Sequence, residues 1–160
     1  MKLLMGVIPA KDRYWLDIVW PVILPGVTEV ASLSNGEYSA FNVYQELFSG
    51  VSQLYLAYLD HEDTTHDQFQ KAWIGKLNNP HQDFVGFAVI QLLPDSFHIF
   101  QAYLMPQYRN SEAFSICEQF IEKEARKMQA PYLSLRTNPQ VVDVAKLGFE
   151  GNQIIYRKKL

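Results

Sequence analysis

The chain has little cysteine, little glycine and no long hydrophobic run. Its single cysteine, Cys117, has no partner for an internal disulfide, which is typical of a reducing compartment. No window approaches the roughly 18 apolar residues of a membrane-spanning helix, and the longest apolar stretch, 18–27, is broken by Pro21 and Pro25. The apolar start at 3–8 is too short for a secretory signal. These absences predict a soluble protein of the cytoplasm, without a membrane partner.

The charge pattern argues against a nucleic-acid partner. The 14 lysines and arginines are outnumbered by 17 aspartates and glutamates, so the formal net charge is −3. Binding to a phosphate backbone needs a basic stripe, and the only long basic run is 157–159 at the C-terminal end. We interpret this run as a solvated strand end.

A metal site is not predicted. The run at 60–67 holds two histidines and four carboxylates. It lacks the helical H-E-x-x-H spacing and the cysteine pairs of common metal sites. We interpret it as a solvated acidic loop, with contact to a partner as the alternative.

The periodicity of the chain predicts strands and helices within one domain. With 160 residues, 48% of them hydrophobic, the chain is long enough to bury a core, and we expect a single domain spanning 1–160. Pro21 and Pro25 are expected to interrupt the first helix, and 60–83 to be mostly loop with one helical turn near 69–73. The expected strands are 3–8, 53–59, 84–94, 96–106, 132–137 and 149–160, and the expected helices are 12–22, 41–48, 111–128 and 141–147. The predicted fold class is α+β, a mixed, mostly antiparallel twisted sheet flanked by helices.

Some residues that resemble catalytic groups have a structural interpretation. Cys117 lies on the apolar face of the helix at 111–128, so we expect a packed thiol. His98 lies in an apolar strand and is expected to be a hydrogen-bonded structural residue, with a catalytic base as the alternative. Tyr14, Trp15 and Trp20 are expected to pack on the sheet; exposed together, they would mark a protein–protein surface.

The element order and two motifs resemble the GNAT superfamily of acyl-CoA-dependent N-acyltransferases. In that family a strand ends in V-x-P-x-x-R-G-x-G-x-G, whose backbone amides bind the pyrophosphate of coenzyme A. Leu104, Pro106 and Arg109 match the start of this pattern. The stretch 135–150, LRTNPQVVDVAKLGFE, is similar to the family's strand, asparagine, helix and closing K-x-G-F-E. The layout at 19–27, 34–50 and 53–58 also resembles short GNAT-fold proteins of tailed phages, which include internal virion proteins.

The resemblance implies an acetyl-CoA site and a route into it. In the family, the pantetheine arm enters a V-shaped gap, which here would lie between the strands at 98–105 and 132–137. The residues at the family's cofactor-binding positions are Leu104, Gln107, Arg109, Asn110, Ser111, Glu112 and Asn138.

The chain departs from the family pattern at the residues that serve the cofactor and the chemistry. Asn110, Glu112 and Phe114 stand at the glycine positions, where a Cβ intrudes on a bound pyrophosphate. Glu112 also brings negative charge to the helix N-terminus, which favours the helix but opposes a phosphate. Val144 stands where the family often has a catalytic tyrosine, and 97–105 contains no carboxylate to act as general base.

Three functions are therefore open at this point. The first is a GNAT-fold protein with a degenerate acyl-CoA turn, acting as a virion or interaction component with protein partners in the host cytoplasm or the virion. The second is an active acetyl-CoA-dependent N-acetyltransferase. The third is a domain that holds CoA or another nucleotide without turnover, since fold alone does not determine function.

Overall fold

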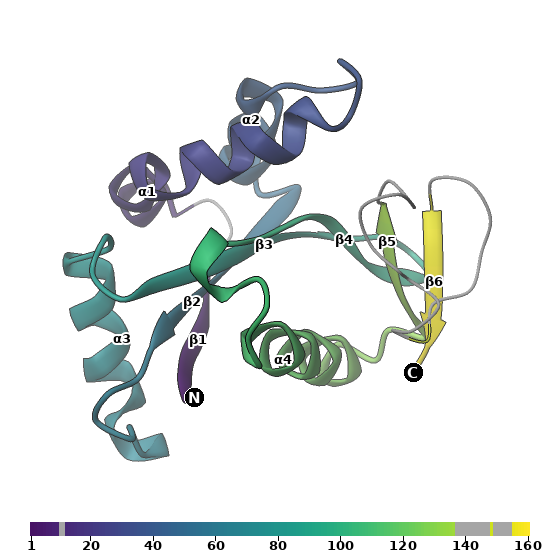
Figure 1. Cartoon of the computed structure of the whole chain (residues 1–160). Helices are drawn as coiled ribbons and strands as arrows, with labels where there is room; N and C mark the ends of the chain where they lie inside the picture. The colour runs from purple at the N-terminus through teal and green to yellow at the C-terminus, as the bar shows by residue number, and fades with distance from the viewer. Residues whose placement is uncertain (10–11, 137–147, 149–154) are drawn as a thin grey trace.

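The computed structural model describes residues 1–9, 12–136, 148 and 155–160. Along the chain, the strands and helices alternate much as the periodicity predicts (Figure 1). The strands are β1 (Leu3–Ile8), β2 (Ser52–Leu59), β3 (Phe84–Leu92), β4 (Ser96–Leu104), β5 (Tyr132–Arg136) and β6 (Ile155–Lys159). The helices are α1 (Arg13–Ser32), α2 (Ala40–Ser49), α3 (Phe69–Asn78) and α4 (Ala113–Lys127), with short 3-10 turns η1 (His66–Gln68) and η2 (Pro106–Tyr108). The predicted helix at 141–147, and the first part of the predicted strand at 149–160, lie outside the described residues.

The described strands form one sheet of six in the order β1-β2-β3-β4-β5-β6. Neighbouring strands pair antiparallel except β4 and β5, which are parallel and joined through α4. This confirms the predicted α+β class with a mixed, mostly antiparallel sheet. The predicted hairpin is also confirmed, because β3 and β4 pair antiparallel across the tight Leu93–Asp95 connection.

Helix α1 corrects the expectation that its prolines would interrupt it. It runs for 20 residues, with Pro21 and Pro25 inside. A helical proline removes the hydrogen bond to the carbonyl four residues earlier, here those of Asp17 and Pro21. Asp17, Pro21 and Pro25 follow one another at intervals of four residues, and all three are exposed. The carbonyls of Asp17 and Pro21 therefore lie on the side of the helix that faces water. The opposite stripe of Leu16, Val19, Ile23 and Val27 is buried and holds the helix on the sheet.

Helix α2 follows α1 along the chain, and helix α3 follows β2. In α2, the N-cap is Ser39, whose N and Oγ donate to Asn42 Oδ1 at 2.8 Å and 2.9 Å, and Gly50 ends the helix in the left-handed conformation. The second correction concerns α3, which is a ten-residue helix rather than one turn. Trp73 and Leu77 on its inner face are buried. This packing stabilises the helix, although its polar sequence gives only a weak indication of helical structure.

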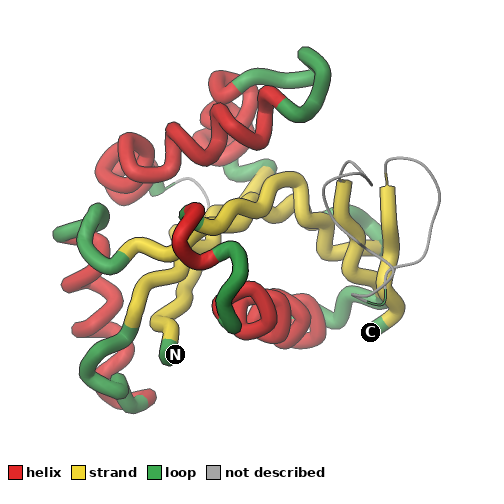
Figure 2. The backbone as a smooth tube through the Cα atoms, in the orientation of Figure 1, coloured by secondary structure: helices red, strands yellow, loops and turns green. Residues whose placement is uncertain are grey.

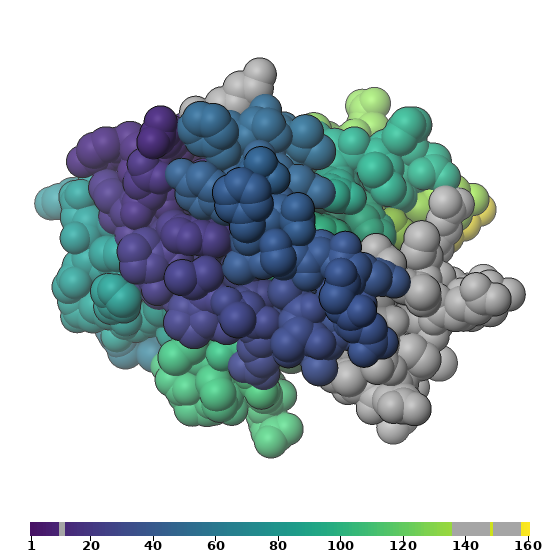
Figure 3. Space-filling view, turned by 90° about the horizontal axis from the view of Figure 1, so that it is seen from above, coloured from purple at the N-terminus to yellow at the C-terminus, as the bar shows by residue number. Residues whose placement is uncertain are grey.

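The sheet separates two packed layers. Helices α1, α2 and α3 lie on one face and α4 lies on the other (Figures 1 and 2). The larger core joins α1, α2 and α3 to β1–β4, whereas Ile121 and Ala125 of α4 pack with Tyr55, Phe97 and Leu133 on the opposite face. Helices α1 and α2 form much of the surface on their side of the molecule (Figure 3). The turn that follows β4, in green, reaches this surface at its edge, beside α1 (Figure 3).

Candidate functional site

Strand β4 has a bulge and then loses its partner on one side. Val89 pairs with Gln101 but Ile90 pairs with Ile99, so Phe100 is an extra residue on β4. The parallel ladder to β5 contains only the pairs from Ser96↔Tyr132 to Ile99↔Leu135. From Phe100 to Leu104, therefore, no described strand pairs with this edge of β4. Strand β5 is described only to Arg136, so the V-shaped gap between the two strands stays a prediction.

The turn between β4 and α4 leaves several backbone amides without a protein partner. Tyr108 N bonds to Met105 O (2.8 Å), Ser111 N bonds to Tyr108 O (3.2 Å), and Ala113 N bonds to Ser111 Oγ (3.2 Å). Among the described residues, nothing accepts a hydrogen bond from the N–H groups of Asn110, Glu112, Phe114 and Ser115. Such amides at the start of a helix are suited to an anion.

Arg109 contacts other residues of the protein and links this turn to α1. Its Nε donates to Leu104 O (3.0 Å), its Nη2 donates to Glu29 Oε1 (2.7 Å), and its guanidinium lies 5.2 Å from the ring centre of Tyr103. Glu29 was not identified from the sequence, since it is 80 residues away and carries no motif. Arg109 thus positions the turn, and its charge is shared with Glu29.

The substituted side chains of the turn point outward. Phe114 is 39% exposed and the side chain of Glu112 is 59% exposed, with the amino group of Met1 as its ion-pair partner. Asn110 and Gln107 are exposed, Ser111 is half-buried, and Leu104 packs toward α4 in a cluster with Ala57, Val85 and Ala113. Asn138 and Val144 lie outside the described residues. The structure thus brings six of the seven predicted cofactor positions together around one turn; whether they bind a cofactor stays a prediction.

Two polar side chains of β4 face the α1–α2 layer. The amide of Gln101 donates from Nε2 to Tyr38 Oη (3.2 Å) and to Val27 O (3.4 Å). His98 Nδ1 lies 2.8 Å from Ser134 Oγ, which donates to Ser96 Oγ at 3.0 Å. His98, Ser96 and Ser134 are all buried, which confirms the hydrogen-bonded, structural interpretation of His98. Nothing in the sequence indicated that Tyr38 and Ser134 contact these side chains, because only the fold brings them to β4.

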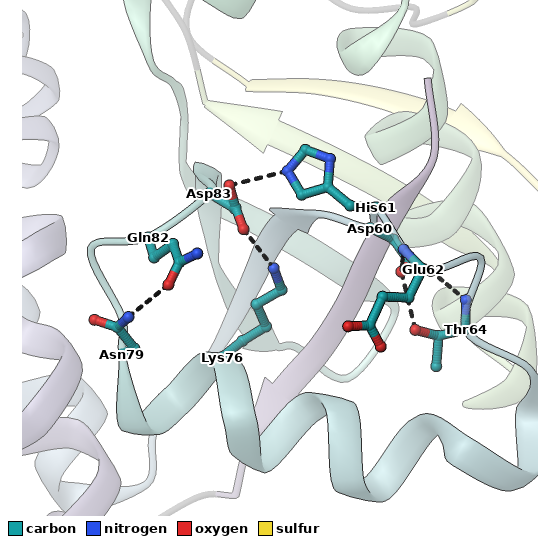
Figure 4. Close-up of polar contacts among 8 residues, drawn as sticks. All are labelled: Asp60, His61, Glu62, Thr64, Lys76, Asn79, Gln82 and Asp83. Atoms are coloured by element: carbon teal, nitrogen blue, oxygen red, sulfur yellow. Dashed lines mark hydrogen bonds and ion pairs between the residues drawn. The ribbon is translucent and has the colours of Figure 1, made fainter.

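The acidic stretch at 60–67 has polar contacts within itself, around Asp60, and outside itself, from His61 to Asp83 (Figure 4). Asp60 accepts from Thr64 N (2.8 Å) and Oγ1 (2.9 Å), and these bonds lower the pKa of the Asp60 carboxyl, although burial opposes the shift. Asp83 lies 2.7 Å from Lys76 Nζ and 3.0 Å from His61 Nε2, which holds its pKa below the usual value. In the described part of the chain, no three His, Cys, Asp or Glu side chains gather as metal ligands.

Two further expectations concern the core and the aromatic residues. Cys117 is half-buried against the Ala57 cluster, and burial raises the pKa of its thiol to about 11, which confirms a packed thiol. Trp15 and Trp20 pack against the core as predicted, whereas Tyr14 is 67% exposed. None of the helices that the structure describes is long and apolar enough to span a membrane.

Comparisons with known proteins find similarity in structure but not in sequence. No protein-family model and no curated protein sequence matches the chain. The IAA acetyltransferase of Bacillus cereus has a TM-score of 0.62 at 12% identity, over 99% of this chain and 100% of its own. The PaiA N-acetyltransferase of Thermoplasma acidophilum, in complex with coenzyme A, has a TM-score of 0.57 at 14% identity over 100% of both chains. A GNAT family acetyltransferase of Elizabethkingia anophelis with acetyl-CoA bound has a TM-score of 0.58 at 13% identity, over 98% of this chain and 99% of its own.

These neighbours share the overall fold of the chain. The similarity extends over 98% or more of this chain. At such low identity, the likeness concerns the fold and not the substrates. The chain therefore has the fold of the GNAT acetyltransferases.

Proposed function

We propose that this protein binds acetyl-CoA at the turn between β4 and α4 and transfers the acetyl group to an amine. The observation that carries the proposal is the set of unpartnered amides at Asn110, Glu112, Phe114 and Ser115. Backbone N–H groups at the N-terminus of a helix favour a phosphate through direct hydrogen bonds and through the helix dipole. The GNAT structures that contain CoA or acetyl-CoA support the same ligand.

The residues around the turn fit this ligand in part. The side chains of Phe114 and Glu112 are exposed, and the backbone amides of the turn have no acceptor among the described residues. Glu112 is unfavourable for a phosphate because its carboxylate lies at the same helix end. Arg109 offsets part of that charge while its contacts to Leu104 and Glu29 keep the turn in place. We therefore expect weak binding rather than none.

The chemistry needs few groups from the protein. Acetyl-CoA supplies an activated acyl group as a thioester; attack by the nitrogen lone pair of an amine forms the amide bond, breaks the C–S bond and releases the thiol. The amine proton passes to water and the leaving thiolate takes a proton from water, since β4 carries no carboxylate. Holding the two reactants together provides most of the rate in such a transfer. The edge of β4 after Ile99, with which no described strand pairs, is the place where we expect this chain to hold them.

Isothermal titration with acetyl-CoA, followed by thiol release with added amines, tests the proposal. A ligand that binds only the native state also raises the melting temperature. We expect saturable binding that weakens in salt, together with amine-dependent release of thiol. Absence of binding at millimolar acetyl-CoA would contradict the proposal.

A second candidate is a protein-interaction component, such as the virion role suggested by the phage-like layout. The observation that favours it is the exposure of apolar side chains on and after α2, with Phe41 65%, Phe48 45% and Val51 61% exposed. Exposed apolar groups of this kind occur at protein–protein surfaces. Co-purification of flanking phage structural proteins with the wild type, and its loss in Phe41→Ser, would support this role; retention of binding by Phe41→Ser would exclude this surface.

A further inference from the structure

Strand β1 is an end strand of the sheet, and only one of its two edges has a partner. It pairs with β2 and with no other strand that the structure describes (Figure 1). The register between them runs without interruption from Leu3↔Leu59 to Ile8↔Leu54. The outer edge of such a strand presents unpaired backbone N–H and C=O groups, to which another strand can pair.

The hydrogen-bond pattern shows which residues present these groups. Asp60 N donates to Lys2 O at 3.0 Å, so these two residues form a hydrogen-bonded pair just before β1. Leu59 N instead donates to Asp83 O at 2.8 Å, away from Leu3. Hydrogen-bonded and non-hydrogen-bonded pairs alternate along an antiparallel ladder, and the alternation continues through the uninterrupted register. The residues whose N–H and C=O point away from β2 are therefore Leu3, Met5 and Val7.

The outer edge of β1 lacks the features that normally prevent strand pairing. Native edge strands often carry charged residues, proline or a bulge for this purpose. The sequence of β1, LLMGVI, has no charge and no proline, and its ladder has no bulge. The strand at the other end of the sheet, β6, contains Lys158 and Lys159. Of the two end strands, β1 is therefore the one suited to pairing.

Helices pack on both faces of β1 and leave its outward-facing residues partly accessible. A Cβ at Gly6 would lie 2.9 Å from the indole of Trp73, so α3 packs directly on one face. On the other face, Leu3 and Met5 pack in the cluster that contains Ala113 of α4. The outward-facing residues Leu3, Met5 and Val7 are only half-buried. An added strand would cover their apolar side chains further.

The spacing of the outward-facing residues fits a second copy of the same strand. Leu3, Met5 and Val7 are symmetric about Met5, so an antiparallel copy places Met5 opposite Met5 and Leu3 opposite Val7. Each of these three pairs can exchange two backbone hydrogen bonds, which satisfies the outward groups of both strands. Directly opposite side chains lie on the same face of a sheet, so apolar groups meet apolar groups. The arrangement is closed by a two-fold axis, the commonest symmetry of homo-oligomers.

We propose that two copies of this protein form a dimer by antiparallel pairing of their β1 strands about a two-fold axis at Met5. The sheets of the two copies become one continuous sheet, with both α4 helices on the same face. The pairing does not depend on the proposed acetyl transfer. One pair of strands is a small interface, and small interfaces belong to transient complexes, so we expect a dissociation constant in the micromolar range.

Sedimentation velocity and amide hydrogen exchange of the full chain, each over a range of protein concentrations, test the pairing. In the dimer the amides of Leu3, Met5 and Val7 acquire acceptors. Their exchange should therefore slow by about tenfold or more as the concentration rises through the micromolar range. The amides of Leu4 and Gly6 already bond to β2 and should exchange slowly at every concentration, so they serve as internal controls.

Charged substitutions at Met5 test the register. Met5→Lys and Met5→Glu each place like charges opposite each other at the axis, which is destabilising, and each should weaken the dimer about tenfold or more. An equimolar mixture of the two places lysine opposite glutamate and should form a 1:1 heterodimer. Leu92→Lys is the matched control, because it adds the same charge at an exposed residue of the interior strand β3, and it should dimerise as the wild type does. If neither charged variant folds, Met5→Pro takes their place, since it removes the outward N–H, which β2 does not use.

Three results would overturn the proposal. A wild-type protein that stays monomeric at millimolar concentration excludes the second copy and leaves the edge of β1 to a strand of another protein. A dimer in which the amides of Leu3, Met5 and Val7 exchange as fast as in the monomer uses another surface. Folded Met5→Lys and Met5→Glu that dimerise as the wild type does, or that form no heterodimer when mixed, contradict the axis at Met5.

Discussion

Replacing Glu112 with glutamine should strengthen acetyl-CoA binding. Glu112 is the residue before the first turn of α4, and its side chain is 59% exposed. Its carboxylate lies at the same helix end as the free amides of the turn, where it pairs with the amino group of Met1. Glutamine is nearly the same size as glutamate, so the substitution changes the charge and leaves the backbone as it is.

The expected gain follows from Coulomb's law. Because Glu112 is exposed, its charge interacts through a water-like dielectric, and a pair of unit charges 4 Å apart repel by about 1 kcal/mol. A pyrophosphate brings a second negative charge at roughly twice that distance, which adds about half as much. The sum of about 1.5 kcal/mol corresponds to an affinity about tenfold higher. The helix itself loses about 0.3–1 kcal/mol, because an acidic group at its N-terminus is stabilising.

A titration at low and at physiological salt measures this gain. The matched control is Glu124→Gln, the same charge change on the same helix. Its position is twelve residues further along α4, about 18 Å at 1.5 Å per residue, which exceeds the Debye length of about 8 Å in physiological salt. We expect the gain for Glu112→Gln to shrink as salt rises and Glu124→Gln to have no effect. Equal or weaker binding by Glu112→Gln would refute a phosphate site at this turn.

Three further substitutions and one chemical treatment test the fold. Asp83 has a φ of 61°, which asparagine tolerates, so Asp83→Asn removes only the charge that pairs with Lys76 and His61; urea unfolding at pH 7 should show a loss of about 1.5–3 kcal/mol. Since the folded pKa of Asp83 is lowered, its stabilisation is present above the unfolded pKa of about 4 and lost as pH falls through the folded value, so the two proteins should converge in acid. A Cβ at Gly86 would lie 2.2 Å from Tyr103 O, whereas one at Gly75 meets nothing within 4 Å; Gly86→Ala should lose at least about 1–3 kcal/mol and Gly75→Ala should gain up to about 1 kcal/mol, and equal melting temperatures would contradict this packing. Cys117, whose burial raises its thiol pKa to about 11, should react with iodoacetamide at about pH 7.5 only after unfolding.

Much of the fold is determined locally and could be predicted. The strands at 84–92 and 96–104 are runs of apolar residues separated by a short turn, and α4 has a regular apolar stripe against charged residues. These patterns depend on neighbours in the sequence, and hydrophobic burial then selects strand or helix. Helix α3 was less predictable, because tertiary packing of Trp73 and Leu77 supplies what its polar sequence lacks.

The prolines of α1 show why a local rule can fail. Pro21 and Pro25 each remove a helical hydrogen bond, and the sequence by itself does not say which carbonyl faces water. The structure places Asp17, Pro21 and Pro25 on the exposed side, so water can satisfy the carbonyls and the helix continues. Burial of the opposite stripe outweighs the loss.

The sequence by itself determined most of the described elements, their order and the turn with its missing glycines. Only the tertiary structure decided what that turn can do. Arg109 is bound by Glu29, Phe114 and Glu112 point outward, and four amides have no acceptor in the described residues. The pairing of Gln101 with Tyr38 likewise depends on one bulged residue in β4. Such contacts join residues far apart in the chain, and their geometry follows from how the sheet and helices pack, which no local pattern contains.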